Sequence, residues 1–478
     1  MAIPSITQTI RDPGLGVTPD AITAFLYLGT SSAGTINTVY AFGNPSDVID
    51  TLGQGPLSED LCYHLAIAGG PVYAVRLTGS VAGAAGSVIK TAIGTSTGTL
   101  AVTGAALDWY DVRIEIRSTG ALGAATFRYS LDGGTTYSPD TTVPSGGTYS
   151  PASTNLTLTW TAGAGPIILE KGDVFTFATT APGYGSTDLA NGITAFKNSN
   201  TAVSTLVLSG QFATAAASAT IAAAMAVHAT SLFQMYTPVR YMMDGGAEDA
   251  ATTKAAFAAF SSERASVGYG ACTVTSAKPI VGRGFPKASI VRPVAGRVAA
   301  SLISTDAAWV SAGALPGVTS ITHDEFRTEL MDQAKFTTLR THQGVAGFFV
   351  TNCRLMSTAG SDYEFYQHGR VMDVATSTAY VSLLPFLNSS VRTTSTGAID
   401  PRDAANWESK VRDAERTVLL DPDNAQGTPG HVSALDVKVD QTTNVLTSKT
   451  VKVKIAIRPL GYAKTITNEL SFSANVGG

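Results

Sequence analysis

The chain has 478 residues, of which 44% are hydrophobic and 14% are charged, a balance typical of folded globular proteins. This length predicts several domains. The formal net charge of −4 excludes a chain-wide basic surface of the kind that holds nucleic acid or an anionic membrane.

The three cysteines, Cys62, Cys272 and Cys353, are too far apart in sequence to form a CxxC metal or redox pair. An odd number is a poor disulfide framework, so we expect a reducing compartment during folding. The first ten residues show no basic region followed by an apolar run, and no secretory signal is expected. The alanine-rich stretch 212–229 is interrupted by polar residues, which favours a packed helix over a membrane span.

Residues 1–20 are predicted to form an N-terminal arm, and residues 21–80 the first part of a core α/β domain. Apolar runs at 24–28 and 71–77 predict strands, and Asn44-Pro45 predicts a turn. A helix is expected over 57–68, since acidic residues stand near its start and two glycines follow its end.

Residues 81–182 lose the helical pattern and are rich in Gly, Thr and Ser, which predicts an inserted all-β domain with a sandwich architecture. Its clearest strand alternates Val112, Ile114 and Ile116 with charged residues. Another strand ends at Asp132-Gly133-Gly134, which is a strong hairpin-turn signal. The two ends of the insertion should lie close together, because the segments on either side belong to one domain.

Residues 183–320 return to alternating elements and are predicted to be the second part of the core domain. The expected order is a strand at 203–208, the alanine-rich helix, an apolar segment at 241–243 and a helix near 248–264.

Residues 321–464 are predicted to form a C-terminal domain, and residues 465–478 a terminal arm strand. One helix has a clear start, with Asp400 as N-cap and Pro401 at the first position. Its apolar face comprises Ala404, Trp407, Val411, Ala414 and Val418. Alternating residues predict strands at 451–457 and 466–472. The fold class is therefore α+β or mixed α/β and multidomain, with a core, an inserted β-sandwich domain and extended N- and C-terminal arms.

Motifs for catalysis or cofactor binding lack structural support in the sequence. The Gly-x-Ser-x-Gly match from Gly94 to Gly98 has no strand before it and no helix after it. The six histidines form no HExxH pair, and no phosphate loop or dinucleotide fingerprint occurs. The group His323-Asp324-Glu325 is better explained as the start of a helix over 326–339 than as acid–base chemistry. We therefore expect no enzyme activity, no cofactor and no metal.

Several segments combine into a recognisable order. They are Gly55-Pro56-Leu57 before a helix, Ala68-Gly69-Gly70-Pro71-Val72-Tyr73-Ala74-Val75-Arg76, Pro293-Val294-Ala295-Gly296-Arg297-Val298-Ala299-Ala300, Gly347 to Cys353, Ser361-Asp362-Tyr363, Arg370-Val371-Met372-Asp373, Gly397-Ala398-Ile399-Asp400, and the terminal strands between His431 and Phe472. In this order they resemble the sheath proteins of contractile phage tails and related injection machines. The segment 127–136 is similar to a β-module that recurs in phage structural proteins.

The resemblance implies a structural subunit that stacks in hexameric rings around a tail tube and contracts to drive the tube through a cell envelope. Its implied partners are further copies of itself, the tail tube protein, and the baseplate and tail terminator proteins, without direct nucleic-acid contact or stable membrane insertion. The implied location is the virion tail, after assembly in the host cytoplasm. The alternative is a surface adhesin or glycan-binding structural protein, which the Thr/Gly-rich insertion favours, and a hydrolase ranks third.

Two sets of residues are candidates for assembly contacts. The arms would add strands to neighbouring subunits, because an unpaired strand edge is a template for another chain; these residues are Ile3, Ile6, Ile10, Ile466, Leu470 and Phe472. The resemblance assigns tube contact to the C-terminal domain, where the candidates are Arg402, Lys410, Arg412 and Arg416. A second candidate for tube contact is an acid-free stretch with Lys278, Arg283, Lys287, Arg292 and Arg297.

Overall fold

The computed structural model describes residues 24–199, 201–328, 330–420 and 430–468. By contacts the chain divides into two units, Met1–Ser377 and Thr378–Gly478. This division lies later in the chain than the expected start of the C-terminal domain at residue 321. The reason is packing, because Phe336, Leu339, Val350 and Leu355 are buried in the hydrophobic clusters of the first unit.

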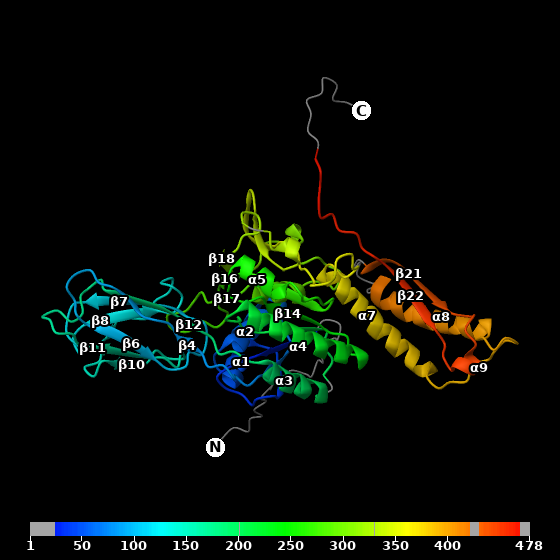
Figure 1. The fold of residues 1–478 in the computed structure, drawn as a ribbon, viewed down its shortest axis with the longest axis horizontal. Coiled ribbons are helices and arrows are strands. Elements are labelled where there is room, and N and C mark those ends of the chain that lie inside the picture. The colour runs from blue at the N-terminus through cyan, green and yellow to red at the C-terminus, as the bar shows by residue number, and fades with distance from the viewer. Residues whose placement is uncertain (1–23, 200, 329, 421–429, 469–478) are drawn as a thin grey trace, which may run out of the picture. The chain divides into compact units, whose positions relative to one another are not determined.

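A six-stranded sheet organises the first unit (Figure 1). Its strands, in spatial order, are β15 (Ala265–Gly268), β14 (Arg240–Asp244), β13 (Thr205–Leu208), β1 (Phe25–Gly29), β3 (Val72–Arg76) and β2 (Val39–Phe42). All neighbouring pairs are parallel except β2 with β3. Every residue of β1, β13, β14 and β15 is buried, as expected of parallel strands covered on both faces. The predicted alternation of strands and helices is confirmed here.

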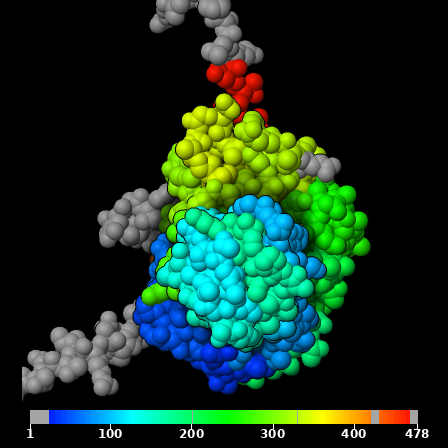
Figure 2. All heavy atoms as spheres, turned by 90° about the vertical axis from the view of Figure 1, so that its left-hand side faces the viewer, coloured from blue at the N-terminus to red at the C-terminus, as the bar shows by residue number. Residues whose placement is uncertain are grey.

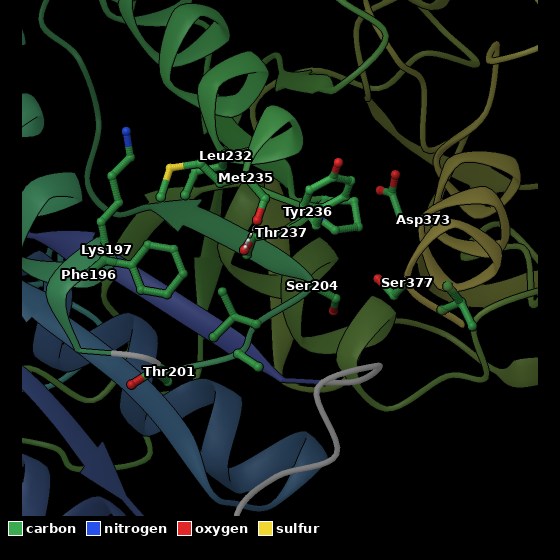
Figure 3. Close-up of a pocket in the computed structure, with 14 residues that line it drawn as sticks. Phe196, Lys197, Thr201, Ser204, Leu232, Met235, Tyr236, Thr237, Asp373 and Ser377 are labelled. Atoms are coloured by element: carbon green, nitrogen blue, oxygen red, sulfur yellow. Dashed lines mark hydrogen bonds between the residues drawn. The ribbon is translucent and has the colours of Figure 1, made fainter. Parts of the chain in front are cut away.

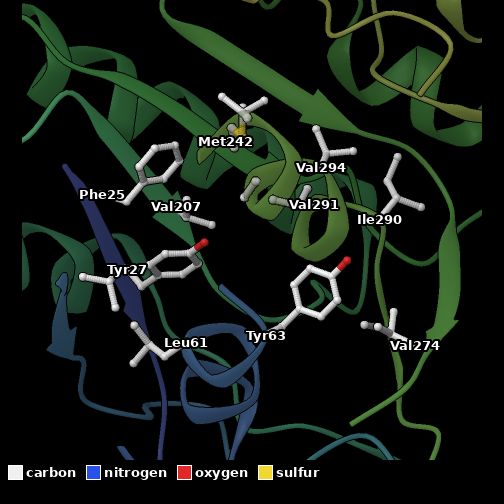
Figure 4. Packing of buried hydrophobic residues seen from close by; sticks show 14 of the residues in the cluster. Phe25, Tyr27, Leu61, Tyr63, Val207, Met242, Val274, Ile290, Val291 and Val294 are labelled. Atoms are coloured by element: carbon white, nitrogen blue, oxygen red, sulfur yellow. The ribbon is translucent and has the colours of Figure 1, made fainter. Parts of the chain in front are cut away.

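Helices cover both faces of this sheet. They are α1 (Pro45–Leu52), α2 (Pro56–Ala68), α3 (Ser186–Asn198), α4 (Ala215–Gln234), α5 (Ala250–Phe257) and α6 (Val291–Ala299). Phe25 and Tyr27 of β1 lie in one hydrophobic cluster with side chains of α2 and α6, such as Tyr63 (Figure 4). Leu26 and Leu28 lie in the other cluster with side chains of α3 and α4. Successive residues of one strand therefore serve two cores.

Among the described residues, one helix, α4, is long and apolar enough to cross a membrane by length and composition alone. Its inner face packs in the second cluster through Ile221, Met225, Ala229 and Leu232. The prediction of a packed helix is confirmed.

Two local predictions in the core domain are corrected. Asn44-Pro45 begins helix α1, because the Asn44 side chain accepts a hydrogen bond from the Asp47 amide at 3.0 Å and the proline occupies the first turn. The predicted helix near 248–264 is shorter, since α5 starts after the N-cap Asp249 and ends at Phe257.

The inserted strands form two sheets around one hydrophobic cluster. The strands are β4 (Ala84–Ala85), β5 (Ile89–Thr91), β6 (Thr99–Thr103), β7 (Asp111–Ser118), β8 (Thr126–Ser130), β9 (Thr141–Thr142), β10 (Thr148–Tyr149), β11 (Thr157–Thr161) and β12 (Val174–Thr180). Ile114, Phe127, Trp160 and Phe175 are among the side chains they share. Figure 2 shows the cyan and teal surface of this segment as one rounded face. Its ends meet, because the amide of Gly183 donates to the Val81 carbonyl at 2.8 Å.

The rest of the first unit consists of short sheets and turns. They are β16 (Ala271–Val274), β17 (Lys287–Ser289), β18 (Val318–Ile321), the hairpin β19 (Leu339–His342) with β20 (Val345–Val350), and the 3-10 turns Val310–Ala312 and Asp332–Ala334. The helix predicted over 326–339 is wrong. The Asp324 carboxylate accepts from the Phe326 amide at 3.1 Å and from the Thr341 amide at 3.0 Å, which closes a turn onto β19.

The second unit contains a helix packed on a hairpin. Helix α7 (Tyr366–Leu383) begins in the first unit, and the second unit adds the 3-10 turn Leu384–Phe386, α8 (Pro401–Glu415), the π-helical turn Arg416–Leu420, β21 (Val432–Val439), α9 (Val445–Ser448) and β22 (Val453–Pro459). The Asp400 side chain accepts from the Arg402 amide at 2.9 Å, so the predicted N-cap is confirmed. Ala404 and Val411 are buried on the predicted apolar face.

Most of the residues predicted to form the two arms lie outside the part of the chain that the structure describes. Ile3, Ile6, Ile10, Leu470 and Phe472 lie outside the described residues. Ile466 is described, belongs to no strand and is 82% exposed.

Loss of the Asp400 cap should destabilise the second unit. Asp400→Ala leaves an α8 amide without its partner, and we expect the free energy of unfolding to fall by about 1 kcal/mol. Urea denaturation followed by circular dichroism measures the change. The control is Asn406→Ala on the exposed face of the same helix, which should be neutral or slightly stabilising. Equal urea midpoints for both variants would show that the Asp400 cap does not stabilise the second unit.

Candidate functional site

The carboxyl ends of the parallel strands form the usual ligand-binding edge of such a sheet. Strand β1 has β3 on one side and β13 on the other, so the direction in which strands are added to the sheet reverses at β1. In open α/β sheets, ligands bind beside such a reversal of strand order. Here the edge holds a cavity of about 380 Å³ whose walls include Asp60, Asp108, Trp109, Ser289 and Arg292. Asp108 and Trp109 come from the inserted segment, so the insertion helps to line this edge.

Five charged side chains meet beside the cavity, and we call them the junction cluster: Glu59, Asp60, Asp108, Arg283 and Arg292. Arg283 lies 3.3 Å from Glu59 and 2.9 Å from Asp108, measured between guanidinium nitrogen and carboxylate oxygen. Arg292 Nε lies 2.5 Å from Asp60 Oδ1 and its Nη1 3.8 Å from Glu59 Oε2. The cluster therefore ties helix α2 to helix α6, to the loop before β17 and to the insertion.

Burial governs the protonation of this cluster. It raises the pKa of Glu59 and of Asp60 above the usual carboxyl range, while Arg283 and Arg292 act in the opposite direction on Glu59, and Arg292 on Asp60. Because the folded pKa exceeds the unfolded one, proton binding favours the folded state. This contribution is fully present below the unfolded pKa and is lost as pH rises through the folded pKa.

A second contact fastens the insertion to the core. The Asp132 carboxylate accepts from the amides of Gly284 at 3.0 Å and Phe285 at 3.2 Å. The Leu131 amide also donates to the Gly282 carbonyl at 2.6 Å. The Asp-Gly-Gly sequence does make a turn, with Gly133 at φ +72°. Its role in docking has no sequence signal, because the partner loop lies about 150 residues later.

The acid-free stretch is not an exposed basic surface, and this candidate for tube contact is wrong for three of its residues. Arg283, Arg292 and Arg297 are 2%, 6% and 8% exposed. Arg297 donates to the carbonyls of Ala312, Gly313 and Ala314. The partners of these arginines come from distant parts of the chain, so the local sequence gave no sign of their burial.

The candidates on helix α8 differ in their surroundings. Arg402, Lys410 and Arg416 are exposed. Arg412 is half-buried, lies 3.9 Å from Glu408 and donates to the Val437 carbonyl at 3.0 Å. Three of the four therefore present charge at the surface of the second unit, and Arg412 also fastens α8 to β21.

The hairpin β21–β22 has two different outer edges. The Asp440 amide bonds to the Lys452 carbonyl, so in this antiparallel register the N–H and C=O groups of Val437 and Val439 point outward from β21. The Arg412 guanidinium donates a hydrogen bond to the outward carbonyl of Val437, and the Glu408 carboxylate accepts one from the Val439 amide at 2.8 Å. On β22 the outward groups belong to Val453, Ile455 and Ile457, and no described residue pairs with that edge. Within the described part of the chain this edge is unpaired, and an unpaired strand edge is a template for another strand.

Chemical sites of other kinds find no support among the described residues. No group of three His, Cys, Asp or Glu side chains could hold a metal ion there. Cys62, Cys272 and Cys353 are buried free thiols. His323 Nε2 lies 2.7 Å from Glu325 Oε2 within the turn that Asp324 closes.

Removal of Arg283 should destabilise the protein strongly. Arg283→Met leaves Glu59 and Asp108 as buried carboxylates that have lost a partner, and we expect a loss of about 3 to 5 kcal/mol at pH 7. The loss should shrink as pH falls, since a buried carboxyl that has lost a cationic partner binds a proton more readily. Urea denaturation at several pH values measures it. Arg327→Met is the control, because that arginine is 69% exposed and its pair with Asp324 should contribute less than about 1 kcal/mol.

Comparisons with known proteins agree with this architecture. The family model described as DUF2586, N-terminal domain, matches residues 3–354. The anti-feeding prophage helical sheath in its contracted state has a similar structure, with a TM-score of 0.53 and 10% identity over 99% of this chain and 100% of that one. The anti-feeding prophage baseplate structure gives a TM-score of 0.52 and 12% identity over 99% of each chain.

A sheath tail protein from Desulfitobacterium hafniense has a lower TM-score of 0.47, with 12% identity over 96% of this chain and 100% of that chain. Comparison with curated proteins gives no match. The resemblance noted in the sequence is confirmed at the level of the fold. The chain belongs to the DUF2586 family, and its mixed helix-and-sheet fold is that of contractile-tail sheath proteins.

Proposed function

We propose that this protein is the structural subunit of a contractile tail sheath, which polymerises around a tail tube and contracts to drive the tube through the target cell envelope. One observation carries the proposal: the fold matches that of a contracted helical sheath along 99% of this chain and 100% of the other. Such a subunit needs no bound nucleotide, because the energy is held in a metastable arrangement of interfaces.

The domain assignment follows the same proposal. We infer arms over residues 1–20 and 465–478, a core domain over 21–80 with 183–320, and a C-terminal sheath domain over 321–464, of which the residues up to Ser377 pack within the first unit. We infer that the insertion 81–182 is a β-sandwich module, supported by its two sheets around one cluster and by its adjoining ends. It would decorate or space the subunits.

The proposed partners are further copies of the chain in stacked hexameric rings, the tail tube, the baseplate and the tail terminator. The arms would link the copies by strand addition, with Ile3, Ile6 and Ile10 in the N-terminal arm and Ile466, Leu470 and Phe472 in the C-terminal arm. The free edge of β22 supports this proposal, because it offers backbone groups that no described residue uses. The location would be the sheath of a virion tail or a related injection device, assembled in the host cytoplasm.

Blocking the outward edge of β22 should stop assembly and leave the fold intact. Ile455→Pro removes an outward amide to which no described residue of the subunit bonds, and proline is tolerated at such an edge. Electron microscopy of the purified full chain should show tubes or rings for the native protein and dispersed subunits for the variant. Ile455→Ala is the matched control, since it removes the same side chain and keeps the amide.

Two outcomes would count against the strand-addition proposal. Tubes formed equally well by Ile455→Pro would mean that β22 is not the template. Dispersed native protein would favour the adhesin or glycan-binding alternative over the sheath.

Reversing the exposed charge of α8 should weaken assembly around the tube. The double variant Arg402→Glu with Lys410→Glu should reduce co-sedimentation with purified tube protein, and the effect should be larger at 10 mM than at 150 mM ionic strength because salt screens such contacts beyond roughly 10 Å. Lys171→Glu on the exposed surface of the insertion is the control for net charge. Unchanged sedimentation of the double variant in low salt would remove α8 as the tube contact.

A further inference from the structure

A groove lies in the first unit at the end of the sheet opposite the junction cluster, and we call it the α3–α4 groove. It has a volume of about 450 Å³. Its walls are the last turns of α3 and α4, the residues before β13 and β14, and one side of α7 (Figure 3). Phe196, Leu232 and Val203 give it an apolar lining.

The rim of this groove exposes large apolar side chains. Met235 and Tyr236, which line it, are 56% and 59% exposed, and Phe233 on the same turn is 40% exposed. Tyr236 also has a φ of +58°, a left-handed conformation that costs energy in a residue other than glycine. An apolar rim held by an unfavourable backbone conformation indicates a binding surface.

The charged groups around the groove are already paired within the unit. Asp373 accepts from Arg264 at 3.1 Å and lies 2.8 Å from Arg240 Nε. Lys197 Nζ donates to Ser231 Oγ at 3.1 Å. These pairs leave apolar surface as the main feature, so the groove suits an apolar segment that carries little charge.

The N-terminal segment joins the described chain at this groove. The Ala24 carbonyl accepts from the amide of Ser204, which lines the groove, at 3.0 Å. Residues 1–23 contain Ile3, Ile6 and Ile10, and their only charged side chains are Arg11, Asp12 and Asp20. An occupant of suitable chemistry is therefore tethered at the rim.

We propose that the α3–α4 groove binds residues 1–23 of the same chain in the unassembled subunit. The short tether gives the segment an effective concentration on the order of millimolar, so even a weak contact is filled within one chain before a neighbour competes. In the proposed sheath, this contact withholds the N-terminal arm until assembly draws it into another subunit. That second half rests on the proposed function, whereas the binding itself does not.

Photo-crosslinking in the full chain tests the contact. Benzoylphenylalanine at Ile6, irradiated at concentrations where the protein is unassembled, should form crosslinks within one chain to residues 232–238, located by mass spectrometry. Met235→Asp should lower their yield about tenfold, because it removes one apolar side chain that the bound segment would cover. Val227→Asp is the matched control, since Val227 is 70% exposed on α4, the helix that ends just before Met235, and does not line the groove.

Three results would overturn the proposal. They are crosslinks that map outside the groove, crosslinks that join two chains, and equal yields from Met235→Asp and Val227→Asp. Benzoylphenylalanine at Ile466 serves as the competing probe, and groove crosslinks from that position alone would assign the surface to the C-terminal arm. Failure of the native protein to form tubes would refute the sheath function and leave the crosslink map valid.

Discussion

Burial of β1 on both faces is the constraint on which the first unit depends. Phe25 and Tyr27 belong to one core, and Leu26 and Leu28 to the other, so helices must cover each side of the sheet. Parallel neighbours in turn require long crossovers. Strands β3 and β13 lie on either side of β1, and the long crossover between them carries the whole insertion followed by α3. A long excursion is tolerated there because the entropy of closing a loop grows slowly with its length.

The junction cluster shows how this excursion is held. Chain connectivity fixes the insertion only at its two ends, where Val81 pairs with Gly183 in a single bridge, and one bridge could not resist rotation. Arg283 adds a charged contact between the insertion and α2. The Asp132 carboxylate of the insertion also accepts hydrogen bonds from two backbone amides of the loop before β17. Buried ion pairs contribute little net stability but penalise a misplaced partner heavily. We interpret the cluster as a device that fixes the orientation of the insertion.

Each unit also has a surface with unused apolar or backbone groups that its described residues leave open. In the first unit it is the α3–α4 groove with its exposed Met235 and Tyr236, and in the second it is the outer edge of β22. On the opposite edge, Arg412 bonds the Val437 carbonyl of β21 and Glu408 bonds the Val439 amide. In the proposed sheath this asymmetry directs strand addition to β22, because two outward backbone groups of β21 are already bonded. Both open surfaces are suited to main-chain or apolar contacts, which salt affects little.

The sequence alone determined the elements whose signals are local. Helix α8 was predicted from its cap Asp400 and its apolar stripe, β1 and β13 from continuous apolar runs, and the strand β22 from alternation. The helix expected over 326–339 failed because Asp324 finds its partner in Thr341, across the turn. The tertiary structure alone decided that Arg283 and Arg292 are buried and which edge of the hairpin is open. Those outcomes depend on carboxylates and amides far away in the chain, and no local pattern records which distant groups will meet.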